Sequence, residues 1–245
     1  MENTDRRSAL VVIIGGIIRY RITESPVFQR LVSKGAVVRS PSIHAFKRDW
    51  IKIILMGLVF TYILVNYGII FFPTGLSYMT LLKIPPIIIY VALLVGALAG
   101  FFGVIIGGTI SDIIGRKMVL LISTTLNIIA SYSYFALVNT LNPINIIIAN
   151  IFFNLSIYIG SGTAVTFLGE QFPTYYRYTG AGFSWQLAGV ITGIFLSILL
   201  PFAIVSARGL LNAWLYIFFM ATALCILSII INLLLLKETK DVKIE

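Results

Sequence analysis

Six long apolar segments decide what this chain can fold into. They are residues 51–72, 86–110, 118–138, 144–168, 181–205 and 213–236. In helical conformation, about 20 apolar residues cross the roughly 30 Å hydrocarbon core of a bilayer. The composition agrees, because 59% of the 245 residues are hydrophobic and only 11% are charged, which lies outside the range of soluble globular domains. The sequence therefore predicts an all-α, polytopic membrane helix bundle that is surrounded by lipid.

A seventh apolar run, residues 9–18, is too short to cross a bilayer. It follows a polar leader, so it is either a signal peptide or the end of a longer helix. No small-residue cleavage site follows Ile18, and cleavage there would move a basic segment to the outer side of the membrane. We therefore interpret residues 1–18 as the end of a truncated transmembrane helix.

The basic residues predict which ends of the segments face the cytoplasm, because short loops rich in Lys and Arg stay inside. If residues 19–52 lie inside and the sides alternate, 14 of the 18 Lys and Arg residues are cytoplasmic. Only Arg6, Arg7, Lys83 and Arg208 are then outside. This asymmetry predicts a multi-pass protein of the plasma membrane. It also accounts for the net charge of +9 without a nucleic acid partner, because the charges are dispersed over loops.

The domain organisation follows from the same pattern. We predict a cytoplasmic central loop at residues 19–50, a six-helix unit at 51–236 and a cytoplasmic tail at 237–245. The central loop mixes basic and apolar residues and contains Pro26 and Pro41. It is either a set of short amphipathic helices at the membrane surface or a solvated linker.

Enzymatic function is not indicated. The sequence contains no nucleophile elbow, no zinc-protease motif and no phosphate-binding loop. The lone Cys225 lies within an apolar segment and is interpreted as a packing residue. We expect no cofactor and no bound metal, and we keep a noncatalytic membrane subunit as an alternative.

One charged motif interrupts the apolar segments. In GGTISDIIGRK, residues 107–117, Gly108 permits close helix approach and Gly115 permits the positive φ of a short turn. Asp112 can accept hydrogen bonds from a neighbouring helix N-terminus or pair with Arg116. Arg116 and Lys117 could alternatively be simple cytoplasmic anchors.

This motif resembles GxxxDxxGRK, the loop signature of the major facilitator superfamily. Two further stretches resemble its metabolite and proton symporters: GEQFPTYYRYTG at residues 169–180 and RYRITESPVFQR at residues 19–30. The resemblance assigns the six spans to helices seven to twelve of a twelve-helix carrier. It implies a cytoplasmic gate at Gly108, Asp112, Gly115, Arg116 and Lys117, with Glu170 and Arg177 as a supporting charge pair.

The first half of such a carrier is absent from this sequence. Carriers of this family rock two six-helix halves about a central cavity, so the resemblance implies half a transporter, completed by a separate chain or by a longer gene product. The implied cargo is a small organic acid or zwitterionic metabolite, moved with protons by alternating access. A sugar-porter-type carrier and a truncated, non-transporting subunit are the alternatives.

Polar residues away from the span ends are the candidates for substrate binding. An amide in hydrocarbon is costly unless it has a partner. The candidates are Tyr62, Asn66, Tyr67, Asn150, Asn154, Tyr158, Trp185 and Gln186. Hydrogen bonding between helices is an equally weighted role for each. No charged residue or His occupies the centre of a span, so a proton-carrying carboxylate would have to lie in the missing half.

Glycines recur four residues apart within two of the spans. The pairs are Gly96 and Gly100, Gly103 and Gly107, and Gly189 and Gly193. Small residues at this spacing let helices approach closely in lipid. We expect close helix packing at all three pairs, or faces that slide over one another during transport.

Overall fold

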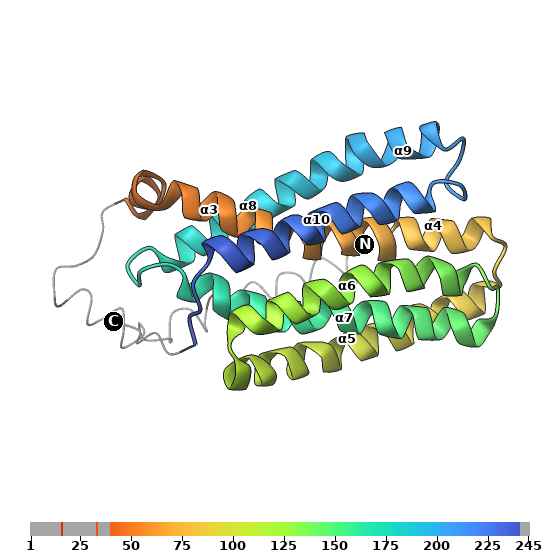
Figure 1. Ribbon diagram of the computed structural model, residues 1–245, viewed down its shortest axis with the longest axis horizontal. Coiled ribbons are helices and arrows are strands. Elements are labelled where there is room, and N and C mark those ends of the chain that lie inside the picture. The colour runs from red at the N-terminus through yellow and green to blue at the C-terminus, as the bar shows by residue number, and fades with distance from the viewer. Residues whose placement is uncertain (1–15, 17–32, 34–39, 241–245) are drawn as a thin grey trace. The chain divides into compact units, whose positions relative to one another are not determined.

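The computed structural model describes Gly16, Ser33 and residues 40–240, and the described residues form helices and their connections, with no strand among them. The elements are α3 (Pro41–Asn66), the π-helix η1 (Tyr67–Phe71), α4 (Thr74–Leu81), α5 (Pro86–Ile114), α6 (Arg116–Val138), α7 (Pro143–Glu170), α8 (Arg177–Ile194), the π-helix η2 (Phe195–Leu199), α9 (Leu200–Ser206) and α10 (Trp214–Leu235), as Figure 1 shows. The predicted all-α bundle is confirmed. The predictions for residues 1–18, 19–39 and 241–245 fall outside the described residues, apart from Gly16 and Ser33.

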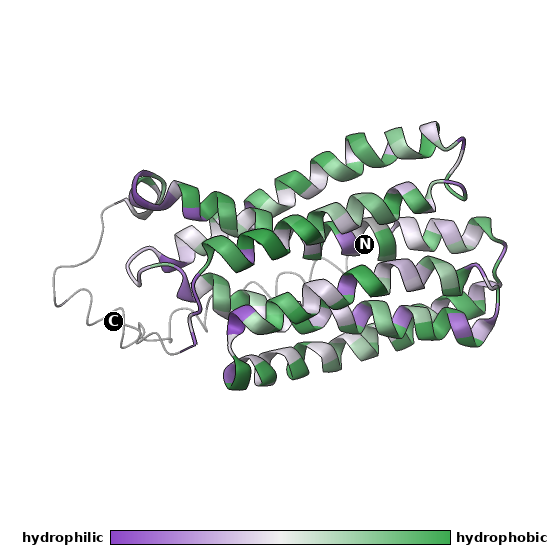
Figure 2. Cartoon of the chain, viewed as in Figure 1, coloured by the Kyte–Doolittle hydropathy of each residue, from purple (hydrophilic) through white to green (hydrophobic). Residues whose placement is uncertain are grey.

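Six helical stretches are long and apolar enough to cross a membrane, as predicted. They are Ser42–Asn66, Pro86–Ile114, Arg116–Val138, Pro143–Glu170, Arg177–Ser206 and Trp214–Leu235. Figure 2 shows hydrophobic residues along the helices and hydrophilic residues mainly near their ends. The protein is therefore a multi-pass membrane protein.

Proline and asparagine explain where several helices begin. Proline fixes a helical φ and lacks the N–H that the first turn cannot use, so it is favoured at this position. Pro41, Pro86 and Pro143 occupy the first turns of α3, α5 and α7. At α7, the Asn142 side chain also accepts a hydrogen bond of 2.9 Å from the Ile144 N–H, which caps the helix.

The first span differs from its predicted limits. Its helix begins at Pro41 rather than at Ile51, and it is kinked at Asp49, whose φ of −127° and ψ of 27° are not helical. The turns before the kink belong to the segment for which short amphipathic helices were one of two interpretations. Phe46 of this part stands edge-on against Phe183 of α8, with ring centroids 4.5 Å apart.

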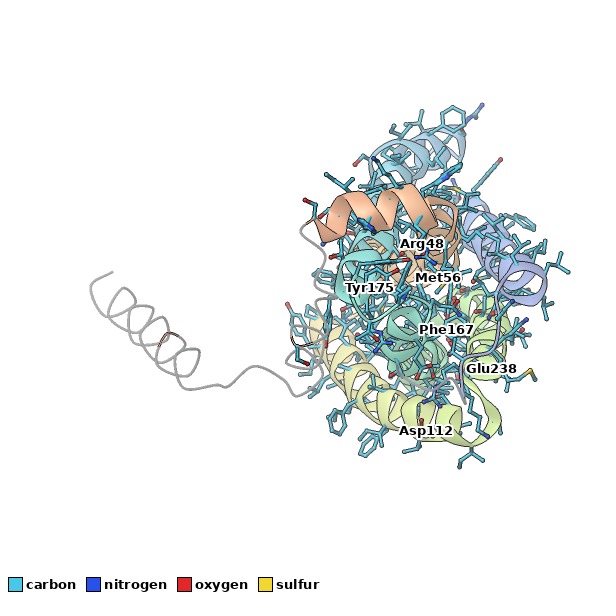
Figure 3. The ribbon with its side chains drawn as sticks, turned by 90° about the vertical axis from the view of Figure 1, so that its left-hand side faces the viewer. Arg48, Met56, Asp112, Phe167, Tyr175 and Glu238 are labelled. Carbon is cyan, nitrogen blue, oxygen red and sulfur yellow. The ribbon has the colours of Figure 1, made fainter. Side chains whose placement is uncertain are left out.

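Helix α7 lies at the centre of the bundle and contacts α3, α5, α6 and α8. Its contact with α5 depends on glycine. A Cβ on Gly107 would overlap the Ile159 carbonyl group, and one on Gly162 would overlap the Val104 carbonyl group. The two backbones therefore touch directly, as predicted from the glycine spacing in α5. Met56 of α3 and Phe167 of α7 are fully buried in the interior (Figure 3).

The glycine pair in α8 is not packed in this way. A Cβ on Gly189 would come no closer than 3.9 Å to another atom of the described residues, and one on Gly193 would meet nothing within 4 Å. The prediction of close packing at Gly189 and Gly193 is therefore wrong for the residues described. In the Arg177–Ser206 span only 17% of the apolar window is buried, against 56% in Ser42–Asn66.

The two ends of the bundle differ in charge. The loop at Gly115, the loop at 171–176, the start of α3 and the tail at 236–240 share one end, which we call the basic end. It carries eight of the ten Lys and Arg residues in the described part of the chain: Lys47, Arg48, Lys52, Arg116, Lys117, Arg177, Lys237 and Lys240. The opposite end carries Lys83 and Arg208.

Candidate functional site

The GxxxDxxGRK motif forms the turn between α5 and α6. Gly115 is the only residue between the two helices, and its φ of 100° favours glycine strongly. A Cβ at this position would also lie 2.5 Å from Glu238 Oε2. Glycine is therefore favoured here by its backbone conformation, and a larger residue would also displace the Glu238 carboxylate. Close helix approach, by contrast, falls at Gly107 and not at the predicted Gly108, where a Cβ would be 3.9 Å from the Gly162 carbonyl oxygen.

Arg116 joins the ends of three helices. Its Nη1 donates a hydrogen bond of 2.9 Å to the Ser111 carbonyl group and lies 2.8 Å from Asp112 Oδ1. Its Nη2 donates to Glu170 Oε1 at 3.4 Å, and its Nε lies 3.3 Å from Glu170 Oε2. The predicted pair of Asp112 and Arg116 is thus present in the structure, whereas the contact between Arg116 and Glu170 was not predicted.

The two carboxylate partners of Arg116 lie in different surroundings. The Asp112 side chain is 69% exposed, whereas those of Glu170 and Arg116 are 17% and 12% exposed. Exposed ion pairs contribute about 0.2–1 kcal/mol, because water screens them and the side chains lose freedom. A partly dry pair interacts more strongly. Glu170, which was predicted as a supporting charge, is therefore the stronger partner of Arg116.

Arg177 does not take the predicted position. Its Nε donates to the Phe172 carbonyl group and its Nη2 to Thr174 Oγ1, both at 3.3 Å. Within the part of the chain that the structure describes, no ion pair joins Arg177 to Glu170. The predicted pair is wrong because Glu170 points toward α6, where Arg116 occupies it. Arg177 instead stabilises the turn that precedes α8.

The C-terminal tail supplies a residue that sequence reasoning missed. Glu238 accepts hydrogen bonds from the backbone N–H groups of Arg116 at 2.9 Å and Lys117 at 3.1 Å. It also accepts from the N–H groups of Thr239 and Lys240 within the tail. Helix α6 has no side-chain cap from its own sequence, so Glu238 satisfies its first N–H groups. The sequence shows only an acidic residue shortly after the last span. Nothing in it links Glu238 to Arg116, which lies 122 positions earlier in the chain.

These hydrogen bonds act on the acidity of Glu238. Partial burial raises the pKa of its carboxyl group, but the N–H groups of Thr239, Arg116, Lys240 and Lys117 outweigh this effect. The net result is a pKa below the ordinary value for glutamate. The residue is therefore ionised at neutral pH, as its role at a helix N-terminus requires.

Two lysine side chains also link these segments, by donating hydrogen bonds to carbonyl groups at helix C-termini. Lys117 Nζ donates to the carbonyl groups of Leu233 and Leu236 at the end of α10, each at 3.0 Å. Lys240 Nζ donates to the Ile113 carbonyl group at the end of α5 at 2.6 Å. Cations at helix C-termini and an anion at an N-terminus both match the helix dipole.

A last contact ties the tail to α7, because Thr239 Oγ1 donates to Glu170 Oε2 at 2.6 Å. The ends of α5, α6, α7 and α10 are thereby held together. We call this set the loop network. It consists of Ser111, Asp112, Arg116, Lys117, Glu170, Glu238, Thr239 and Lys240. Figure 3 looks onto this end of the bundle, with Asp112 and Glu238 on one side of it.

The substrate-binding candidates within the membrane separate into groups. Tyr62 and Asn66 are fully buried. The Tyr62 hydroxyl lies 3.2 Å from Ser123 Oγ of α6, and Asn66 Oδ1 accepts from Ser131 Oγ at 3.3 Å. Asn66 Nδ2 also lies 3.6 Å from Cys225 of α10. In this arrangement Tyr62 and Asn66 hydrogen-bond between helices, which was the second role considered for them.

A second group consists of Tyr67, the first residue of η1, and three residues of α7, of which Asn150 and Asn154 lie against Gly96 of α5. Tyr67 is 37% exposed, and its ring stands edge-on to that of Tyr158, with centroids 6.3 Å apart. Asn154 Nδ2 donates to the Asn150 carbonyl group at 2.8 Å. Asn150 Nδ2 donates to Ile146 at 2.8 Å, but its Oδ1 is buried without a hydrogen-bond partner. Of the candidates, Tyr67 and Tyr158 are the pair that the structure brings into direct side-chain contact.

The remaining candidates lie on α8. The partly buried Trp185 packs at a tilt against Phe60, with ring centroids 6.3 Å apart, and Gln186 is exposed. Within residues 40–240, no three His, Cys, Asp or Glu side chains come together to hold a metal ion. Cys225 is buried, in agreement with a packing role.

Comparison with known proteins places the sequence in a family. Residues 87–241 match the model of the family described as sugar (and other) transporter. The inner membrane metabolite transport protein YhjE of Escherichia coli (strain K12) is 30% identical over 195 residues, which cover 75% of this chain and 43% of that protein. A putative metabolite transport protein of Haemophilus influenzae is 27% identical over 250 residues, covering 96% of this chain and 54% of that protein. No solved structure matches.

These relatives are transporters and not enzymes. The chain spans about half of their length, at 43% and 54%. The family match includes the loop network and five of the six membrane-spanning helices, from α5 to α10. The chain belongs to the sugar (and other) transporter family of the major facilitator superfamily.

Proposed function

We propose that this chain is the C-terminal half, helices seven to twelve, of a secondary transporter that works by alternating access. The observation that carries the proposal is the loop network, because it joins four helix ends at the basic end through partly buried charges. A carrier must hold each of its conformations long enough to keep the opposite side closed. A network of this kind stabilises one conformation and has to break for the other.

We place the basic end in the cytoplasm. The eight basic residues there, against two at the other end, follow the positive-inside pattern. The loop network is then a cytoplasmic gate, with Arg116 at its centre and Glu170 as its main partner. The bacterial relative named as an inner membrane protein supports a plasma membrane location.

For the cargo we propose a small organic acid or zwitterionic metabolite. The names of both relatives support metabolite transport. The side-chain oxygen Oδ1 of Asn150, buried without a hydrogen-bond partner, leaves an acceptor available to a substrate donor. Tyr67 and Tyr158 add aromatic surface on the same side of α7 as η1. A sugar is the second candidate, since the family description names sugars first.

A proton-coupled mechanism requires a titratable group outside the described spans. The described membrane-spanning helices carry no Asp, Glu, Lys, Arg or His in their central parts. A proton-binding group in a membrane is normally a carboxylate or a histidine. We therefore propose that the coupling carboxylate belongs to the six helices that complete the carrier.

The proposal is tested by uptake into proteoliposomes that contain the complete carrier, with the chain or product that supplies the other half. Asp112→Asn is expected to slow uptake of a metabolite cargo while insertion into the membrane stays unchanged. Lys47→Gln, at an exposed cation of the same end outside the loop network, is the matched control and is expected to transport normally. Unchanged uptake by Asp112→Asn would contradict the gating role.

A further inference from the structure

A second site lies at the basic end, beside the loop network. It is a pocket of about 430 Å³ between the start of α3, the loop at 171–176 and the end of α10. None of its lining residues belongs to the loop network. Arg48, Lys52 and Lys237 line it together with one carboxylate, that of Asp49.

The cations of this pocket are only partly used. Asp49 accepts a hydrogen bond from the Tyr176 hydroxyl and lies 3.5 Å from Lys52 Nζ. Lys52 Nζ also donates to the Gln171 carbonyl group at 3.1 Å, and Arg48 Nη1 donates to the Tyr175 hydroxyl at 2.9 Å. A guanidinium has five donors and an ammonium three, so both retain free N–H groups. The pocket therefore carries excess positive charge with donors to spare.

The walls of the pocket change character with depth. Trp50, 53% exposed, lines it beside the kink at Asp49. Tryptophan at a span end favours the level of the lipid headgroups. Leu55 lines the pocket about one turn after Lys52 on α3, and Leu235 lines it as the last residue of α10. A charged compartment at the headgroup level thus continues into an apolar wall, and Leu235 of that wall is 57% exposed.

We propose that this pocket binds an anionic phospholipid of the leaflet at the basic end. Its phosphate lies among Arg48, Lys52 and Lys237, and an acyl chain lies along Leu55 and Leu235. Basic pockets between membrane helices at the cytoplasmic side are suited to anionic lipid headgroups. A soluble anion would use the cations but leave the apolar wall without a partner. A zwitterionic lipid would bring an ammonium group toward three cations.

The test is native mass spectrometry of the full chain in neutral detergent during titration with phosphatidylglycerol. Wild type is expected to retain one phosphatidylglycerol molecule at concentrations at which phosphatidylethanolamine is not retained. Arg48→Gln and Lys237→Gln are each expected to weaken this binding about fivefold, the usual contribution of one cation near a membrane surface.

Two control variants distinguish specific lipid binding in the pocket from diffuse electrostatic attraction of anionic lipid to the basic end. Lys47→Gln removes an adjacent exposed cation that does not line the pocket, and it is expected to bind as wild type. Tyr175→Phe removes the partner of Arg48 but keeps the cation, and it is also expected to retain the lipid. If Lys47→Gln weakens binding as much as Arg48→Gln does, the attraction is diffuse and the proposal is overturned.

A parallel titration with inorganic phosphate distinguishes the two sources of the phosphate group. The lipid proposal predicts no protection of the chain against thermal unfolding by phosphate at concentrations at which phosphatidylglycerol protects. Equal protection by phosphate, lost in Lys237→Gln, would assign the pocket to a soluble anion and overturn the proposal. Equal retention of phosphatidylethanolamine would overturn it as well.

Discussion

Helices α5 and α8 lie at opposite edges of the bundle (Figure 1), and both carry glycines four residues apart. Only in α5 does the glycine face pack closely against another helix. Helix α5 touches α7 through its glycine face, and the loop network ties its end at Ile114. Helix α8 packs mainly on α3, and its glycine face meets nothing within 4 Å at Gly193. The same glycine spacing therefore produces a fixed contact on one helix and an open face on the other. A small-residue face makes close approach possible, but the other helices decide whether it occurs.

The largest expected effect is at the glycine face of α5, which packs against α7. Gly107→Leu places a side chain where even a Cβ would overlap the Ile159 carbonyl group, so α5 cannot pack on α7. Overpacking in well-packed interiors costs about 1–3 kcal/mol, and more where the backbone cannot yield. We expect loss of the monodisperse fraction in size-exclusion chromatography. A variant that remains monodisperse, with an unchanged unfolding temperature, would show that the contact does not hold the two helices.

The second prediction concerns the loop network and compares the effects on uptake of its two carboxylate partners of Arg116. Glu170→Gln is expected to slow uptake by the complete carrier by about tenfold, equivalent to about 1.4 kcal/mol, because it removes the partly buried partner of Arg116. Asp112→Asn is expected to have a smaller effect, since its side chain is largely exposed. Equal rates for the two variants in proteoliposomes would show that burial does not determine the strength of these pairs.

The third prediction uses pH to release the tail. Glu238 has a lowered pKa when docked, so its contribution to docking is complete above the pKa of the free carboxyl group, about 4.3. It is lost as the pH falls through the docked pKa. We expect hydrogen-exchange protection of the Arg116 and Lys117 amides to fall over that range. Glu238→Gln should show little such dependence, and a variant with the same pH profile as wild type would exclude Glu238 as the group that titrates.

The smallest effect on folding is expected at the open face. A Cβ at Gly193 would meet nothing within 4 Å among the described residues. We therefore expect the unfolding temperature of Gly193→Leu to remain within about 2 °C of wild type, as for most surface substitutions. If this face moves against the other half of a carrier, uptake should fall although folding does not. A large loss of stability would show that the face is packed after all.

The sequence predicted the six spans and the turn at Gly115 because both depend on local patterns. Apolar length predicts a span, and a glycine between two charged helix ends predicts a tight turn. Arg116 and Glu170 could be singled out from the sequence because both belong to recognisable motifs. Their pairing could not, and Glu170 was instead expected to pair with Arg177. That choice depends on how α6 and α7 are rotated, which packing decides.

Longer-range features escaped prediction for a related reason. Glu238 acts on a helix that is distant in sequence, and its own surroundings form no motif. Tyr62 and Asn66 were chosen because polar groups in lipid need partners, and the structure supplies these partners on α6 and α10. Sequence can identify a polar residue in a span. It cannot tell whether that residue faces a neighbouring helix or a cavity.

The most direct test is a double-mutant cycle on Arg116 and Glu170, the two central residues of the proposed gate. Uptake by the complete carrier is measured for Arg116→Gln, Glu170→Gln and the double variant. If Arg116 and Glu170 act as one pair, the double variant will transport about as fast as Arg116→Gln alone, because the second change removes nothing further. If the two reductions in rate multiply, the residues act independently, and the gate assigned to the basic end is contradicted.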